Sequence, residues 1–80
     1  MKYGYDLLDN LEKIHTTELG NTRIKRNLEL ETEDVVNWCK QKIKHADNIK
    51  KKGKNWYISF ENYVITINAN SFTIITGHKK

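Results

Sequence analysis

The chain has no proline and one cysteine, and its four glycines are isolated from one another. Because no segment has the composition of a linker, residues 1–80 are expected to form a single domain. A lone cysteine, Cys39, cannot form an internal disulfide, and its place in a helical apolar pattern favours a buried thiol over a nucleophile. Isolated glycines also argue against a phosphate-binding loop, and therefore against nucleotide hydrolysis.

Long apolar runs are missing too. The chain contains no stretch of about 18 apolar residues that would span a bilayer, and its amino terminus lacks the apolar core of a signal peptide. These absences predict a cytoplasmic protein with no membrane partner. Cys39, His15, His45 and His78 have none of the compact spacings of zinc sites, so no metal or other cofactor is expected.

Charge is divided unevenly along the chain. Residues 1–39 contain 5 Lys/Arg and 8 Asp/Glu, a net charge of −3, and residues 40–80 contain 9 and 2, a net charge of +7, which together give +4. This asymmetry predicts an anionic partner for the carboxy-terminal half, with nucleic acid as the first candidate and an acidic protein as the second. A solvated, lysine-rich surface without a ligand is the simpler explanation.

Apolar residues alternate with polar ones through three successive segments between Lys54 and His78. The pattern predicts antiparallel strands broken at Glu61-Asn62 and at Ala69-Asn70. With two-residue turns, six side chains share the core face: Trp56, Ile58, Ile65, Ile67, Phe72 and Ile74. The other face collects Tyr57, Ser59, Val64, Thr66, Thr73 and Ile75, and is either wet or a binding surface. A longer loop at either turn would shift this register.

A fourth strand is predicted over Ile49–Lys52, paired with Asn55–Ser59, where its lysines would protect a sheet edge from aggregation. Three helical segments precede the strands. The first is predicted from about Tyr3 to Ile14, because its leucines recur at spacings of three and four.

A second helix begins at a cap formed by Thr16 or Thr17, or, in a shorter form, at Thr22. The predicted cap of the third helix is Thr32, and its buried side is Val35, Val36, Cys39 and Ile43. The predicted fold is therefore α+β, with two to three N-terminal helices packed on a C-terminal three- to four-stranded antiparallel meander.

Three runs cover nearly the whole chain: IHTTELGNTRIKRNL, DVVNWCKQKI and GKNWYISF…ITINANSFTIITGHK. Together they resemble a family of small bacterial proteins known as a domain of unknown function. The resemblance implies one compact domain and brings no activity with it.

The last segment, SFTIITGHK, is similar to the final strand of the barnase, EndoU, colicin-D and RelE-like ribonuclease group. This resemblance implies metal-independent cleavage or binding of RNA, with catalytic positions at His15, Lys54, Thr76 and His78. The chain departs from the group because it lacks the long amino-terminal region of many such nucleases. Thr76 and His78 are two residues apart on a strand and are therefore expected on one side, the side of Phe72 and Ile74, with His78 just past the rim of the core.

Cleavage of RNA through its 2′-hydroxyl needs a base, an acid and a cation or hydrogen-bond donors for the phosphate. His15, His78, Arg23 and Lys54 are the candidate catalytic residues, provided that the fold brings them together. Structural roles are the alternatives, since His15 stands at a helix end and His78 near the end of a strand.

Binding of nucleic acid without cleavage needs only a basic groove and an aromatic platform. Five residues have that composition: Lys50, Lys51, Lys52, Lys54 and Tyr57. A third possibility is a protein-interaction module that uses the hydroxyl-rich face or an edge strand. The sequence leaves open whether the protein is an enzyme, whether its partner is RNA or a protein, and what its oligomeric state is.

Overall fold

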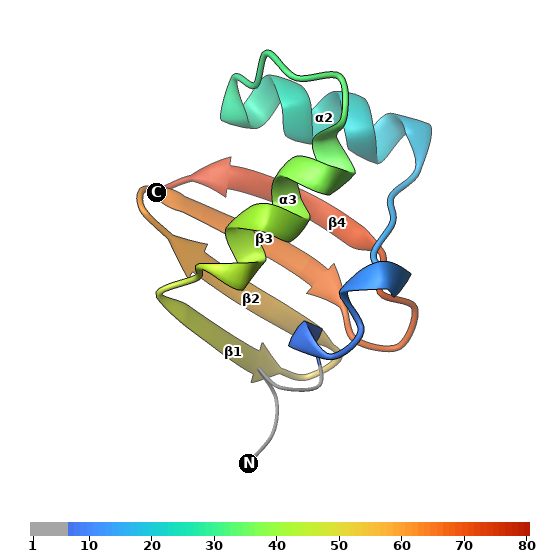
Figure 1. Ribbon diagram of the computed structural model, residues 1–80, viewed down its shortest axis with the longest axis vertical. Helices are drawn as coiled ribbons and strands as arrows, with labels where there is room; N and C mark the ends of the chain where they lie inside the picture. Colours follow the sequence, from blue (N-terminus) through green and yellow to red (C-terminus); the bar gives the residue numbers. More distant parts are fainter. Residues whose placement is uncertain (1–6) are drawn as a thin grey trace.

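The computed structural model describes residues 7–80, which form two α-helices followed by a four-stranded antiparallel sheet (Figure 1). The elements are the 3-10 turn η1 (Leu11–Lys13), α2 (Glu18–Leu28), α3 (Val35–Lys44), β1 (Asn48–Lys52), β2 (Asn55–Phe60), β3 (Tyr63–Asn68) and β4 (Ile74–Lys79). The strand order β1-β2-β3-β4 is a meander, which confirms the α+β class. Among residues 7–80, no helix has the length and apolar content needed to cross a bilayer.

Side chains cap both helices. The Thr17 hydroxyl accepts a hydrogen bond from the Gly20 backbone N–H at 3.0 Å, which confirms one of the predicted starts of α2. At α3 the predicted cap is wrong: the Asp34 carboxylate accepts from the Asn37 N–H at 3.0 Å. Thr32 instead accepts from the Asp34 N–H at 3.1 Å, and thereby positions the capping residue.

The first predicted helix differs from the structure. Its first four residues, from Tyr3, lie outside the described residues, and the described remainder ends in the short 3-10 turn η1. A helix that runs to Ile14 is therefore wrong. The apolar residues of this segment still enter the core, because Leu7 and Ile14 are 0% and 3% exposed.

The register of the first hairpin is confirmed. Across the turn at Glu61-Asn62, Phe60 pairs with Tyr63 and Ile58 pairs with Ile65. The predicted β1 is also present and pairs with β2 along its whole length.

The register of the second hairpin is wrong. Ile67 pairs with Ile74 rather than Phe72, and Ile65 pairs with Gly77 rather than Ile74. There are two reasons. The connection between β3 and β4 runs over residues 69–73, and a bulge opposite Thr66 and Ile67 leaves one β4 residue, Ile75, without a partner.

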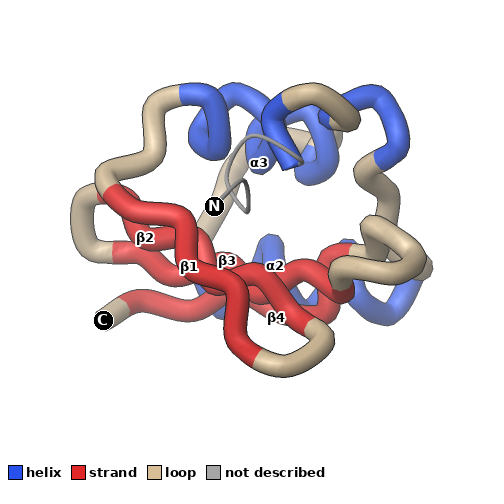
Figure 2. The backbone as a smooth tube through the Cα atoms, turned by 90° about the horizontal axis from the view of Figure 1, so that it is seen from below, coloured by secondary structure: helices blue, strands red, loops and turns tan. Residues whose placement is uncertain are grey.

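The core lies between this sheet and the helices, and α3 lies on one side of the strand layer when the molecule is seen from below (Figure 2). Five of the six predicted inward residues are at most 3% exposed: Trp56, Ile58, Ile65, Ile67 and Ile74. Phe72 is half-buried and packs on the Trp56 ring, with a centroid distance of 5.2 Å. α2 runs beside β4, where Gly77 leaves room for Ile24 and Leu28, since an added Cβ would lie 3.3 Å from the Leu28 Cδ1 atom.

Candidate nucleic-acid interface

Alternate residues of the four strands point away from the core and form a second surface, which we call the open face. The described helices contact the other side of the sheet: α3 lies on that side (Figure 2), and α2 packs on β4 at Gly77, which alternates with Thr76 and His78. The members of the open face follow from the pairing register: Asn48, Lys50 and Lys52 from β1, Asn55, Tyr57 and Ser59 from β2, Val64, Thr66 and Asn68 from β3, and Thr76 and His78 from β4. No residue in this set is acidic.

The bulge at Ile75 determines what β4 contributes to the open face. Thr76 pairs with Thr66, His78 pairs with Val64, and Gly77 between them turns toward α2. The predicted core-side position of Thr76 and His78 is therefore wrong, because one extra residue in a strand exchanges the faces of everything after it.

A single aromatic ring lies within a row of residues across the open face. Lys50 pairs with Tyr57, Tyr57 with Thr66, and Thr66 with Thr76, so that one residue from each strand stands beside the next. Side chains paired in this way have Cβ atoms about 4.5–5.5 Å apart. Lys50 is exposed and Tyr57 half-buried, whereas Thr66, between two neighbours, is only 7% exposed. A shallow hollow beside the ring is lined by Lys50, Lys52, Gly53 and Tyr57.

The uneven charge of the sequence becomes a difference between surfaces. Five acidic residues of the amino-terminal half lie on α2 or on the connection that follows it: Glu18, Glu29, Glu31, Glu33 and Asp34. Asp9 and Glu12 lie before α2, next to or within the 3-10 turn η1. The two acidic residues of the carboxy-terminal half are engaged at the β2–β3 turn. Asp47 accepts from the Glu61 N–H at 3.2 Å, and the Glu61 carboxylate pairs with Lys42 at 3.4 Å. The lysines of the open face therefore have no carboxylate beside them in the sheet register.

The predicted nucleic-acid-binding residues are brought together only in part. Lys50, Lys52 and Tyr57 share the open face, but Lys51 alternates to the covered side, opposite Trp56. Lys54 lies in the turn between β1 and β2, and its carbonyl accepts from the Ala69 N–H at 2.7 Å, next to the β3–β4 loop. Its side chain is exposed at the end of the sheet.

The predicted catalytic residues lie in different places. Arg23 is exposed on α2, and Lys54 is in a turn. His15 forms an isolated bridge with Thr73, the residue before β4. His78 lies five residues beyond Thr73, roughly 16 Å away along a strand, on the open face. No single surface of the described chain contains all four candidates.

A family model described as a protein of unknown function (DUF3781) matches residues 8–78, a span that includes every element of the described fold. The chain belongs to the DUF3781 family. Searches of curated proteins and of solved structures gave no match. Because the family description assigns no activity, the function of this DUF3781 domain has to be inferred from its geometry.

His15 closes one edge of the DUF3781 sheet. Its backbone bonds to Phe72 and Ile74 at 3.1 and 2.8 Å, and its ring contacts the Lys13 carbonyl at 2.9 Å and the Thr73 hydroxyl at 3.0 Å. Sequence reasoning missed the partnership with Thr73, which it placed on a strand face. The edge is further protected by Thr16, which donates to the Ile74 carbonyl at 2.9 Å. These bonds give His15 a structural role.

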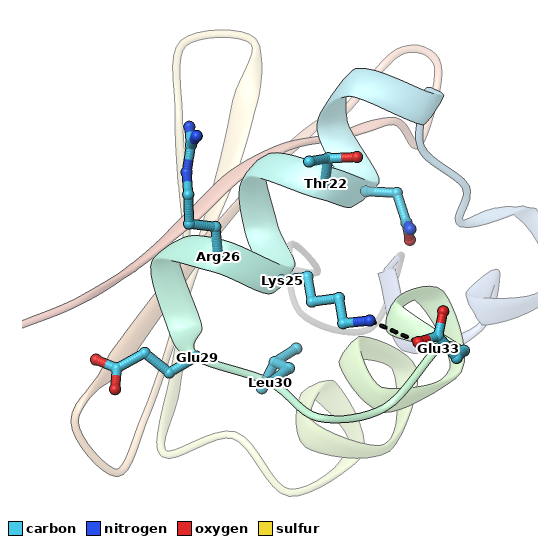
Figure 3. A pocket seen from close by; sticks show the side chains of 7 residues that line it. Thr22, Lys25, Arg26, Glu29, Leu30 and Glu33 are labelled. Carbon is cyan, nitrogen blue, oxygen red and sulfur yellow. Dashed lines mark hydrogen bonds and ion pairs between the residues drawn. The ribbon is translucent and has the colours of Figure 1, made fainter.

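A second hollow lies between α2 and the connection to α3 (Figure 3). Lys25 and Glu33 form an ion pair of 2.7 Å at its mouth, while Arg26 points away from that pair (Figure 3). The hydrogen bond and the charge of Lys25 lower the pKa of Glu33. Because Lys25 already has a carboxylate partner and two carboxylates, Glu29 and Glu33, line the hollow, it suits an anionic ligand less well than the open face does.

Metal and thiol chemistry have no support in this part of the chain. Residues 7–80 contain no cluster of three His, Cys, Asp or Glu side chains that would hold a metal ion. Burial raises the pKa of the Cys39 thiol to about 12, so the nucleophilic thiolate is not formed at neutral pH.

Proposed function

We propose that this DUF3781 domain binds single-stranded nucleic acid, with RNA as the expected ligand, through its open face and without cleaving it. One observation carries the proposal: Tyr57 stands directly opposite Lys50, beside Lys52, on a sheet face that has neither a helix nor an acidic residue among those described.

The chemistry of this arrangement fits single strands. An aromatic ring on a sheet offers a stacking surface to any base, and lysines beside it neutralise the phosphates on either side of that base. A duplex hides its base faces, so the ring would contribute nothing to duplex binding. Binding without cleavage is favoured because the candidate acid, base and cation lie on separate parts of the molecule.

The decisive experiment replaces Tyr57 with valine, which removes the ring and keeps a residue suited to a strand. Binding of a fluorescent single-stranded oligonucleotide, measured by anisotropy, is expected to weaken by about 5- to 150-fold, because one base stack contributes about 1–3 kcal/mol. Tyr57→Phe keeps the ring and is expected to bind nearly as well as the wild type. Equal affinities for all three proteins would overturn the proposal.

A charge-matched pair of variants tests the lysines. Lys50→Gln with Lys52→Gln removes two charges from the open face, and Lys40→Gln with Lys44→Gln removes two from α3. The first pair is expected to reduce the slope of log K against log salt by about 1.4, since each phosphate contact on a single strand contributes about 0.7. The second pair is expected to leave it unchanged. Cleavage of RNA in EDTA by the wild type would instead identify a ribonuclease.

A further inference from the structure

The bulge at Ile75 leaves the apolar side chain of Ile75 39% exposed and shifts the rest of β4 onto the opposite faces. Bulges occur often next to binding sites, where they redirect a side chain. Here the redirected residues are Thr76 and His78, which join the face that carries Tyr57.

Thr76 and His78 also have unused hydrogen-bonding capacity. Neither side chain has a hydrogen-bond partner among residues 7–80. Four other threonines have hydroxyls that are bonded within the fold: Thr16, Thr17, Thr32 and Thr73. Thr22 on α2 and Thr66 beside Thr76 share the lack of a bonded hydroxyl, so what sets Thr76 apart is its place on the open face beyond Thr66.

The order of the strands orients a bound nucleotide. Lysines lie on the β1 side of Tyr57, and Thr66 and Thr76 lie on its β3 and β4 side, at distances of about one and two strand spacings of 4.8 Å. A nucleotide whose phosphate contacts Lys50 points its sugar toward β1. In that orientation, the hydrogen-bonding edge of a base stacked on Tyr57 would face the side of β3 and β4, where Thr66 and Thr76 lie.

We propose that Thr76 and His78 read the edge of the base that stacks on Tyr57, and so give this surface a preference among bases. The inference rests on the proposed function, and it assigns to these two residues a role in specificity and not in cleavage. A hydroxyl and an imidazole each donate and accept hydrogen bonds, as recognition of base edges requires.

The test compares the affinities of four RNA homopolymers of equal length, and of an abasic strand of that length, for the wild type and for Thr76→Val. Valine keeps the shape and strand preference of threonine and removes the hydroxyl. The wild type is expected to prefer one homopolymer, and the variant to lose roughly 3- to 10-fold affinity for it, as for one hydrogen bond. Binding of the abasic strand is expected to stay the same.

Thr22→Val is the matched control, because Thr22 is an exposed threonine of α2, away from the open face. It is expected to bind every ligand as the wild type does. If Thr76→Val does not fold, His78→Ala on the exposed end of β4 serves instead, with the same expected result. In the wild type, the His78 ring signals in NMR spectra are expected to move on addition of the preferred homopolymer and not on addition of the abasic strand.

The outcomes separate the two proposals. A wild type that binds none of the strands overturns both. A wild type that binds all four homopolymers equally, or a Thr76→Val variant that weakens them all by the same factor, overturns base reading and leaves nucleic-acid binding in place.

Discussion

The two faces of the sheet are made by alternate residues of the same four strands, and they differ in burial and in charge. The covered face carries Ile58, Ile65 and Ile67, all 0% exposed under the helices. The open face carries lysines, hydroxyls, amides and one tyrosine. Neighbours in sequence therefore differ in role: residues of the covered face stabilise the fold, and residues of the open face bind the ligand in the function proposed above.

This difference shows how a short chain accommodates a site. An 80-residue domain has a modest core, so few residues can be withdrawn from it. A site on the alternate residues of existing strands uses none of the core positions. The same holds for β4, because the bulge brings His78 to the open face and leaves Ile74 in the core.

The largest expected effect comes from comparing two adjacent residues of β3. Ile65→Ala on the covered face is expected to lower the free energy of unfolding by about 2–5 kcal/mol, through lost burial and a residual cavity. Val64→Ala on the open face, where the side chain is half-buried, is expected to cost about 1 kcal/mol or less. Urea unfolding followed by circular dichroism measures both values. Equal losses would mean that the open face is buried in solution, which would break the comparison.

The same comparison explains which parts of the fold the sequence predicts. Strict alternation and a two-residue turn determine the pairing of Ile58 with Ile65, so the first hairpin is correct. The residues on the far side of the second turn have the same alternation, but neither loop length nor a bulge is encoded by period-two patterning. Phe72 takes a left-handed φ of 59°, which is unusual for a bulky residue and gives no signal in the sequence.

The candidate site is predictable to a similar extent. Lys50, Lys52 and Tyr57 lie before the second turn, in the part whose register is correct, and they share a face. Thr76 and His78 come after the bulge, and their placement depends on packing of Gly77 against α2, a contact between distant segments. The local sequence pattern does not contain that information. The predicted positions of Thr76 and His78, two of the catalytic candidates, depended on it.

A second prediction compares the reactivity of thiols on the two sides. Cys39, on the buried side of α3, is 0% exposed, and Ser59 is half-buried on the open face. In the native protein Cys39 is expected to react with a thiol reagent only through unfolding, whereas Ser59→Cys in a Cys39→Ala background is expected to react much faster. Equal labelling rates, measured by absorbance, would show that the helices do not seal the covered face.

The buried thiol also predicts a dependence on pH. Burial raises the pKa of Cys39 to about 12, whereas the unfolded thiol ionises near its ordinary value of about 9. Between these values the unfolded state holds fewer protons, so the stability is fully present below about pH 9 and is lost as pH rises toward 12. The loss is about 1.4 kcal/mol per pH unit, and Cys39→Ala is expected to remove it.

The smallest effect is expected at the rim of the covered face, where Lys79 and Glu29 form an exposed ion pair of 2.8 Å. A hydrogen bond from Lys79 and its charge lower the pKa of Glu29 below 4.5, so any stabilisation is present above that pH and is lost as pH falls through the folded pKa. Solvent and salt screen such pairs, so Lys79→Gln is expected to leave the urea midpoint at pH 7 nearly unchanged.

The pair should still be visible in a titration, because the Glu29 pKa is expected to return toward 4.5 in Lys79→Gln when followed by NMR. Lys80→Gln, which removes the neighbouring charge, is the control. A loss of stability in Lys79→Gln as large as in Ile65→Ala would mean that electrostatics at the rim, rather than apolar burial, holds the helices on the sheet. The difference between the covered and open faces would then be one of charge and not of burial.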